Sequence, residues 1–409
     1  MTAWEKILQK VLVGSNIDSS QWNSIQAGLR DRAFFSSKVA EMNILDAAQK
    51  ISSEYAKGEK DLSRLRMELK DFIENKAGYV PSDNIRGTIK DLTSKARLDV
   101  IIKTNVAQAR GFIQYAEGMT PGAFAAFPAQ EFTRIEHRNQ PRTTWPQRWK
   151  NAGGKLYAGR MIALKDDPVW TRLSIFGEPF PPFDWGSGMG VMDVSKREAI
   201  ELGLITEEEL QAKREELREQ EKNKTLPSMN GNLQAEIPFK NDNAWQLAKK
   251  ALGDQVQIDK QTGTIKFFSE IFKENFDKGN FTFRLGESTE QLINKLPSSV
   301  PADSIRGKSL VVTQHYLNKK RENGIDHRDH YTTMLDHPED IPLETRDIEL
   351  LPSLWRNPSR VYDSHGRLVL ELDALDGSIY RAVVDIKKDP NLKTFYRTLE
   401  PYETQTPSS

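Results

Sequence analysis

The chain has 409 residues, no cysteine, and 58 basic against 58 acidic side chains. This length suggests two or three domains. The lack of cysteine excludes disulfides, thiolate zinc sites and cysteine nucleophiles. Balanced charge gives no global argument for binding nucleic acid or a membrane, so any electrostatic footprint must be local. No apolar run approaches the roughly 20 residues that span a bilayer, and the N-terminus does not resemble a signal peptide. We therefore expect a soluble protein without a membrane partner.

Residues 1–118 are predicted to be helical. Apolar side chains recur at helical spacing in LRMELKDFIENKAG and in LDVIIKTNVAQARGFIQYAEGM. Glycine and proline are sparse until GYVPSDN at 78–84. No part of this region has the pattern of a catalytic site, so we expect a helical scaffold.

Residues 119–205 differ sharply, because they are rich in proline and aromatic side chains. Four of the eight tryptophans of the chain fall here, namely Trp145, Trp149, Trp170 and Trp185. We expect a loop-rich module packed by aromatic side chains. A helical pattern returns at VSKREAIELGLITEEELQ, which begins like a capped helix and passes Gly203 into a second one.

The stretch SIFGEPFPPFDWGSGMGVMDV (174–194) is the most unusual part of this module. Its prolines restrict the backbone, and its glycines accept a positive φ at little cost. It contains neither histidine nor lysine, so a role as a catalytic lid is not favoured. We expect a rigid loop that serves as a contact surface, packed down by Phe176, Phe180, Phe183 and Trp185.

Residues 206–240 are predicted to be a linker, because a charged helix end is followed by polar turn residues. Residues 241–409 are predicted to form another domain. Helices are expected in NAWQLAKKALG, STEQLINKL and KSLVVTQHYLNKKREN, and strands over 367–373, 380–387 and 392–399. Short turn sequences between the strands predict an antiparallel meander. The fold class is therefore α+β, with a mostly helical N-terminal module, a loop-rich aromatic segment, and a C-terminal domain of helices followed by the β-meander.

Histidine is concentrated in this last domain, which holds five of the six in the chain: His315, His327, His330, His337 and His365. Imidazole has an ordinary pKa of about 6.5, which suits acid–base catalysis near neutral pH. His327 and His330 are three residues apart and would share one helix face, as metal ligands can. No recognised zinc spacing appears, however. Structural or surface histidines, acid–base catalysis and metal ligation all stay open.

Cationic and hydroxyl side chains lie near the histidines in sequence, namely Arg356, Arg360, Arg381, Thr394, Tyr396 and Arg397. Strand alternation places Thr394 and Tyr396 on one face. Cleavage of an RNA phosphodiester without a metal needs a base for the 2′-hydroxyl, an acid for the leaving oxygen and fixed cations. The alternative is that these arginines cover the solvent face of the sheet. Residues 300–409 hold 15 Lys and Arg against 18 Asp and Glu, which does not favour general RNA affinity.

The order of several segments between residues 95 and 205 resembles the phage head morphogenesis family, the minor head proteins related to the Mu F protein. These segments are LDVIIKTNVAQARGFIQYAEG, WPQRWKNAGG, the 174–194 stretch and KREAIELGLI. The family carries a Thr-Asn pair and an Arg–Tyr pair on a helix, here Thr104, Asn105, Arg110 and Tyr115. Many members have cysteines at the proline-rich turn, where this chain has PPFDWGSGM, so aromatic packing is expected there instead of a metal. The resemblance implies a capsid or portal-region protein with phage portal or capsid proteins as partners.

Residues 300–400 resemble phage-associated nuclease domains of the barnase–EndoU–colicin–RelE-like class, which typically end phage head proteins. The resemblance rests on HPEDIPLETRDIELLPSLWRNPSRVY, YRAVVDIK and KTFYR. The matching positions are His337, Leu351 with Pro352, Tyr380 with Arg381, and Thr394 with Phe395 and Arg397. The resemblance implies helices followed by a four-stranded antiparallel sheet, and an RNase that uses neither metal nor cofactor.

Together the two resemblances predict a phage minor head protein with a C-terminal RNase-like domain, present in the virion and in the host cytoplasm. His337 would be the general acid or base, with His327 and His330 as candidates for the second proton transfer. Of the remaining candidates, Arg381 and Arg397 would hold the phosphate, Thr394 and Tyr396 would position it, and Arg356 and Arg360 would bind further substrate. Two alternatives remain: a purely structural head or connector protein with an inactive C-terminal binding module, and a bacterial toxin or effector unrelated to virions.

Overall fold

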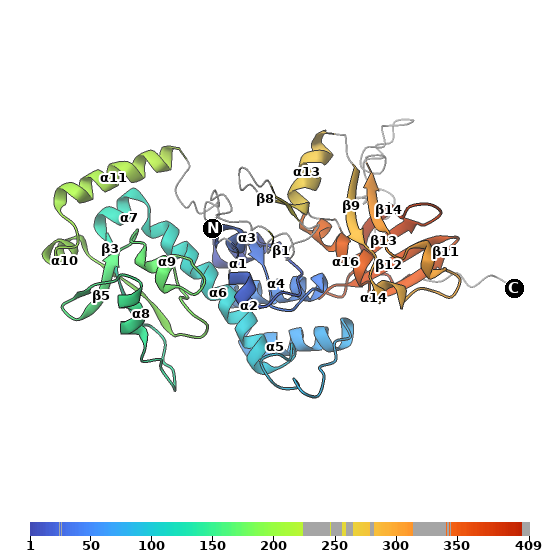
Figure 1. The fold of residues 1–409 in the computed structure, drawn as a ribbon, viewed down its shortest axis with the longest axis horizontal. Helices are drawn as coiled ribbons and strands as arrows, with labels where there is room; N and C mark the ends of the chain where they lie inside the picture. The colour runs from blue at the N-terminus through green and yellow to red at the C-terminus, as the bar shows by residue number, and fades with distance from the viewer. Residues whose placement is uncertain are drawn as a thin grey trace.

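The computed structural model describes residues 1–23, 25, 27–223, 246, 256–258, 265–278, 282–313, 341, 343 and 345–402. The chain has the predicted mixed α+β fold, with a helical N-terminal half and its largest sheet near the C-terminus. Figure 1 shows the N-terminal helices in the centre, between a module formed by 119–222 and the C-terminal sheet. Within the described residues, no helix is long and apolar enough to cross a membrane.

Residues 1–118 form the predicted helical scaffold, with one short parallel pair between β1 and β2. Side chains cap several of its helices, among them Thr2 on α1, Asp61 on α5 and Ser94 on α6. The elements are α1 (Ala3–Leu8), β1 (Val11–Leu12), α2 (Ser19–Asn23), α3 (Ala27–Arg32), β2 (Ala33–Phe34), α4 (Met42–Lys57), α5 (Leu62–Asp71), the π-helical turn η1 (Phe72–Lys76) and α6 (Lys95–Gly118).

The long helix α6 joins the scaffold to the next module. Its buried side chains recur every three or four residues, as expected for an amphipathic helix. Leu98, Ile102 and Val106 lie in the core of the scaffold. Phe112 and Ala116, further along, pack against Phe180 of the 174–194 stretch instead.

Residues 119–222 contain more regular structure than the sequence predicts. A four-stranded antiparallel sheet runs in the order β4-β5-β3-β6. Its strands are two to six residues long, too short to give a clear alternation in the sequence. The elements are α7 (Pro121–Ala126), β3 (Ala129–Arg134), α8 (Trp145–Asn151), β4 (Leu156–Tyr157), β5 (Arg160–Leu164), α9 (Val169–Leu173), β6 (Met189–Val194), α10 (Lys196–Glu201) and α11 (Glu207–Lys222).

Aromatic side chains fill the core of this module, as predicted. Trp149 stacks on Phe132 and meets Trp170 edge to face, with ring centroids 6.1 and 5.2 Å apart. The indole N–H groups of Trp149 and Trp170 donate to backbone carbonyls at 2.8 and 2.7 Å. The buried indoles are therefore satisfied, which makes them stable core residues.

The 174–194 stretch is pinned by aromatic side chains, as predicted. Phe180 packs edge to face on Phe112 of α6, with centroids 5.8 Å apart. Gly111 permits this approach, because a Cβ there would lie 1.9 Å from the carbonyl oxygen of Pro181. The last six residues, Met189–Val194, form strand β6 rather than loop.

Two helices follow β6, as the sequence predicts, and the first is capped as expected. Ser195 caps α10, and Thr206 with Glu209 forms a capping box on α11. Leu210 and Leu217 of α11 are buried in the core of this module. The first part of the predicted linker, up to Lys222, is thus a packed helix; most of its remainder lies outside the described residues.

The C-terminal region contains the predicted meander within a larger sheet of order β11-β12-β13-β14-β10-β9. All its pairings are antiparallel except that of β10 with β14. The three predicted strands are confirmed as β12, β13 and β14. The elements are β7 (Val256–Ile258), β8 (Ile265–Phe267), α13 (Phe268–Lys278), β9 (Thr282–Glu287), α14 (Glu290–Ile293), the 3₁₀-helices η3 (Ala302–Ser304) and η5 (Thr345–Leu350), β10 (Ser309–Thr313), α16 (Leu351–Arg356), β11 (Arg360–Ser364), β12 (Arg367–Asp373), β13 (Ile379–Asp385) and β14 (Asn391–Thr398).

One predicted helix is wrong in its first part. In KSLVVTQHYLNKKREN, residues Ser309–Thr313 form β10. The β-branched run Val311–Thr313 favours an extended backbone, and pairing with two strands buries Leu310 and Val312. The helix predicted at STEQLINKL is present as α14. The helix predicted at NAWQLAKKALG lies outside the described residues, apart from Gln246.

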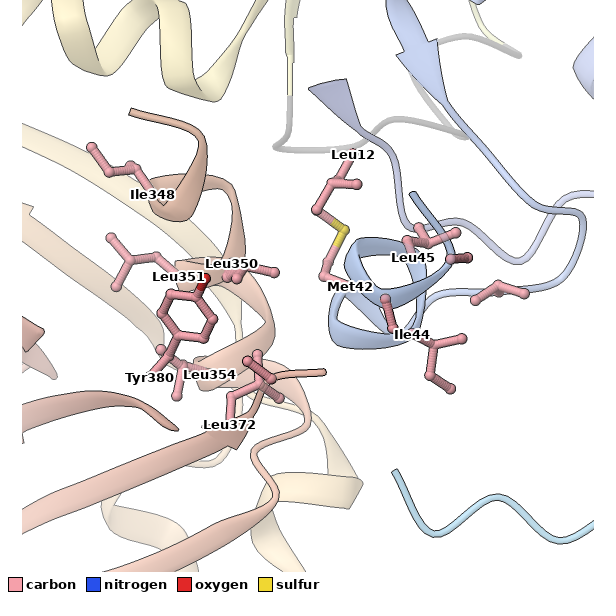
Figure 2. Packing of buried hydrophobic residues seen from close by; sticks show 14 of the residues in the cluster. Leu12, Met42, Ile44, Leu45, Ile348, Leu350, Leu351, Leu354, Leu372 and Tyr380 are labelled. Carbon is pink, nitrogen blue, oxygen red and sulfur yellow. The ribbon is translucent and has the colours of Figure 1, made fainter. Parts of the chain in front are cut away.

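The scaffold and the C-terminal sheet share one hydrophobic core, although residues 119–281 separate them in sequence. Figure 2 shows Leu12, Met42 and Leu45 on the scaffold side, facing the side of η5 and α16. On the C-terminal side the core includes Ile348, Leu350, Leu351, Leu354, Leu372 and Tyr380. One face of the sheet is therefore committed to packing.

Buried polar groups cross the same junction. Arg346 of η5 forms an ion pair with Asp46 of α4 at 2.8 Å. Glu349 accepts from the backbone N–H of Leu12 at 2.8 Å and from the Ser269 hydroxyl at 2.9 Å. Burial raises the pKa of Glu349 to about 7. The carboxyl group thus links three segments while being costly to ionise.

This raised pKa predicts a pH dependence of stability. The folded state holds the Glu349 proton more tightly than the unfolded chain does. The contribution is therefore present below pH 4.5 and is lost as the pH rises through about 7. Its full size is roughly 3 kcal/mol. We expect the Glu349→Gln chain to lose less stability than the unaltered chain between pH 5 and pH 8, measured as urea-unfolding free energies. The exposed Glu219→Gln change is the control, and identical pH profiles for all three chains would contradict this prediction.

Candidate functional site

Four side chains form a row across one face of the C-terminal sheet. The strand register places Arg360 of β11 opposite Glu371 of β12, Glu371 opposite Arg381 of β13, and Arg381 opposite Tyr396 of β14. Directly opposed residues point to the same side of a sheet. The row is on the face opposite to that packed against the scaffold, where Leu372 and Tyr380 lie.

Glu371 is the centre of the row and is fully buried, with 0% of its surface exposed. Its Oε2 accepts from the Nε of Arg360 at 2.8 Å. Its Oε1 accepts from the Nε and Nη2 of Arg381 at 2.8 and 2.6 Å. A carboxylate at this depth is tolerable only when it is paired and hydrogen-bonded, and two guanidinium groups meet that need.

Arg381 is itself 7% exposed and is surrounded by acceptors. Its Nη1 donates to the Tyr396 hydroxyl at 3.0 Å, and its Cζ lies 5.4 Å from the centroid of the Tyr396 ring. Burial acts to lower the pKa of Arg381, but the hydrogen bonds to Tyr396 and Glu371 outweigh it and raise the pKa. The guanidinium therefore stays charged throughout the physiological range.

Arg360 is the outer cation of the row. In addition to Glu371 it binds Asp373 with both Nη atoms, at 2.9 and 2.5 Å. The paired hydrogen bonds to Asp373 are the main cause of a raised pKa for Arg360. Two carboxylates and two guanidinium groups thus alternate across β11, β12 and β13, so that the row has no large net charge.

The C-terminal end of the described chain crosses the row. The carbonyl of Glu400 accepts from Arg381 Nη2 at 2.6 Å. The backbone N–H of Tyr402 donates to Glu371 Oε1 at 3.2 Å. The Tyr402 ring lies 5.1 Å from the ring of Tyr362 and 5.5 Å from the Cζ of Arg381. Residues 400–402 therefore cap the centre of the row and occupy donors that a phosphate would need.

Arg397, predicted to act with Arg381, lies on the other face of the sheet. It is opposite Tyr380, and its Cζ is 5.2 Å from the centroid of that ring. Its Nε donates to the Ser378 hydroxyl at 2.8 Å, and it forms an ion pair with Asp376. The structure does not bring the two predicted phosphate-binding arginines together, because consecutive positions of a strand alternate in face.

Thr394 shares the face of Tyr396, as the alternation predicts. It lies one row further along the sheet, opposite Val383. Its Oγ1 is buried and has no hydrogen-bond partner among the described residues. A buried hydroxyl without a partner is uncommon and leaves one donor and one acceptor position beside the row.

Arg356 lies away from the row, at the end of α16. It lines a cleft of about 910 Å³ between the scaffold and the C-terminal region, together with Lys38, Asn43 and Thr289. The backbone carbonyl of Arg356 accepts from the Thr289 hydroxyl. Of the two predicted substrate-binding arginines, only Arg360 belongs to the row.

The histidine candidates His327, His330 and His337 lie outside the described residues, as does His315. His365 occupies the two-residue turn between β11 and β12, with a φ of 52°, followed by Gly366 with a φ of 78°. Two successive positive φ values match a type I′ hairpin turn. The location of His365 is thus explained by turn geometry.

Glu371 and residues 400–402 are the members of this site that the sequence did not single out. The strand RLVLELD offers a signal for Glu371, because it places one carboxylate inside a run of apolar residues. Such a residue needs a buried partner. The sequence does not show which cation it meets, since that depends on register.

The described residues contain no group of three or more His, Asp and Glu side chains that could hold a metal ion. No protein-family model, curated protein or solved structure matches the chain. The two family resemblances therefore remain predictions that rest on the motifs themselves.

Removing one member of a buried ion network leaves its partners buried without a counter-charge. The loss of stability that follows can be measured. We expect Glu371→Ala to destabilise the protein by about 3–5 kcal/mol, because two arginines lose their buried counter-charge. Glu371→Gln should cost less, since an amide oxygen still accepts from one arginine. Urea unfolding measures both, with Glu219→Ala as an exposed control. A loss below about 1 kcal/mol for Glu371→Ala, a value ordinary for exposed ion pairs, would show that the network is not buried in solution.

Proposed function

We propose that the chain is a phage minor head protein whose C-terminal domain is an RNase-like module that cleaves RNA without a metal. The assignment to phage heads rests on the resemblance of residues 95–205 and on the order of the two modules. The proposal for the C-terminal domain rests on the motifs of residues 300–400 and on one observation, the row of Arg360, Glu371, Arg381 and Tyr396 on four adjacent strands.

The chemistry of this row fits attack of a 2′-hydroxyl on its phosphodiester. Once residues 400–402 move aside and the Tyr402 N–H leaves Oε1, the Glu371 carboxylate is our candidate for accepting the hydroxyl proton. Arg381 and Arg360 provide guanidinium groups for the charge that develops on phosphorus-bound oxygens. Tyr396 donates a hydrogen bond to the same phosphate, and His337 remains our candidate for protonating the leaving 5′-oxygen. Arg397 is left out of this site, because it lies on the other face.

The cap supplied by residues 400–402 makes this a latent site. In the observed arrangement Arg381 gives its hydrogen bonds to Glu371, Tyr396 and the carbonyl of Glu400. A phosphate oxygen can replace the Glu400 carbonyl only if the chain after Leu399 moves aside. RNA binding therefore competes with the C-terminal residues for the same donor.

A second function is favoured by the same contacts. In this alternative, the arginines that are neutralised by Glu371, Asp373 and Asp376 hold the sheet together and bind no phosphate. The domain would then be an inactive binding module within the head, fixed to the scaffold by their shared core. This is the structural alternative, and an activity measurement separates it from the RNase.

The experiment compares the full chain with a chain that ends at Leu399, each incubated with total RNA in EDTA. We expect the shortened chain to cleave RNA faster, because its row is uncapped. Tyr396→Phe in the shortened chain should slow cleavage by about a hundredfold, if the phenol acts on the phosphate. Tyr55→Phe, in the scaffold, is the matched control. No cleavage by either chain would overturn the RNase proposal in favour of the binding module. Mass spectrometry of purified virions tests the phage-head assignment separately.

A further inference from the structure

A pocket that shares no lining residue with the C-terminal sheet brings together two sequence features to which the proposed function gives no binding role. It has a volume of about 270 Å³ and lies between α6, the segment 10–37 and the stretch 174–194. Thr104 and Asn105 of the Thr-Asn pair line it from α6, and Glu178 and Trp185 line it from the stretch. Its size is near the lower end of the range for sites that bind small ligands.

Buried cations dominate the charge of this pocket. Lys10 and Arg30 line it, and each is only 7% exposed. Arg30 donates from its Nε to the carbonyl of Ile25 at 2.8 Å, and neither cation has an ion pair among the described residues. Burial lowers the pKa of Arg30, in contrast to the raised pKa of the paired Arg360. Glu178 and Asp31 act in the opposite direction on the pKa of Arg30, but burial outweighs them, and neither carboxylate forms an ion pair with Arg30 or Lys10 among the described residues. Buried charges without a direct ion pair are in an unfavourable state.

Arg97 of α6 adds a third cation to the wall. Its Nη2 donates to the Ser36 hydroxyl at 2.9 Å and to the Ser37 carbonyl at 2.5 Å. Its Nε is buried and has no hydrogen-bond partner within the part of the chain that the structure describes. Burial lowers the pKa of Arg97 as well. The pocket wall thus contains an unused charged donor.

Acidic side chains at the pocket carry less charge than the basic ones. Glu178 is the carboxylate that lines the pocket, and it is 4% exposed. Burial raises its pKa to about 7, so it is partly protonated at neutral pH. The neighbouring Asp31 is paired with Lys6 at 2.8 Å and also acts to raise the pKa of Arg30, so two carboxylates face the four cations Lys6, Lys10, Arg30 and Arg97. An excess of positive charge therefore remains.

Aromatic rings form the other walls. Trp22 stacks on Phe35 with centroids 4.1 Å apart, and Phe176 meets Trp185 edge to face at 4.8 Å. Such walls favour a flat apolar group. Asn105 donates from its Nδ2 to the carbonyl of Ile101 at 2.8 Å, which fixes the amide and leaves its oxygen to accept from a ligand.

We propose that this pocket binds a small organic anion that carries a planar ring, with the anionic group on Lys10 and Arg30 and the ring between the aromatic walls. A nucleoside monophosphate and an aromatic carboxylate share this chemistry. The bound anion supplies the direct ion pair that Lys10 and Arg30 do not have among the described residues. Because the pocket joins the scaffold to the 174–194 stretch, its ligand also stabilises their contact.

Isothermal titration calorimetry on the full chain tests this with four probes: adenosine monophosphate, benzoate, inorganic phosphate and benzyl alcohol. We expect at least one of the first two to bind about tenfold or more tightly than either of the last two. The first two probes distinguish a nucleotide from an aromatic acid. Failure of both to bind at about 10 mM, or equal binding of phosphate or benzyl alcohol, would overturn the proposal.

Two variants locate the binding. Lys10→Met keeps the length of the side chain and removes its charge, so it should weaken the anionic ring probe by about tenfold or more. Lys70→Met, on the exposed surface of α5, is the matched control and should leave binding unchanged. Trp185→Leu, at a half-buried position, should weaken the ring probe even if Lys10→Met does not fold. Unchanged affinity in folded Lys10→Met and Trp185→Leu chains would show that the ligand binds elsewhere.

Discussion

The apolar contact between α4 and the η5–α16 segment organises the rest of the molecule. It fixes which face of the C-terminal sheet is packed, because Leu372 and Tyr380 turn toward the scaffold core. Strand alternation then places Arg360, Glu371, Arg381 and Tyr396 on the opposite face. The position of the site we propose therefore follows from the position of the hydrophobic core. Packing of one face of the sheet determines which side chains lie together on the other.

The buried carboxylate Glu371 is the most constrained group on that second face. Replacing such an ion network by apolar side chains is often neutral or stabilising, so the network is weak evidence for a stability role alone. Two arginines held around one carboxylate, with a phenol in contact, form a preorganised set of charges across one face of the sheet. Residues 400–402 cover this set through hydrogen bonds to Arg381 and Glu371. The same observations fit a closed structural network if the chain end never leaves.

Features of the fold that depend on neighbouring residues could be predicted from the sequence, and those that depend on distant contacts could not. The meander strands, the caps of α10 and α11 and the packing of the tryptophans follow from local patterns. The shared core joins segments more than 200 residues apart, and β10 owes its extended form to pairing on both sides. The sequence shows Glu371 as a carboxylate within an apolar strand. It does not show which cations bind this carboxylate, because that depends on the register of the neighbouring strands. The alternation that places Thr394 and Tyr396 on one face also places Arg397 on the other. The separation of Arg397 from Arg381 could therefore have been predicted from the sequence.

Because they share one hydrophobic core, the scaffold and the C-terminal sheet are expected to unfold as one body. Native-state hydrogen exchange, followed residue by residue with increasing urea, tests this claim most directly. We expect the slowest amides of α4 and of β13 to report the same opening free energy and the same urea dependence. Leu351→Ala should lower both values together, because this side chain is buried in the common core. Exchange in α4 that is unaffected by this change, with a separate opening free energy, would contradict the claim.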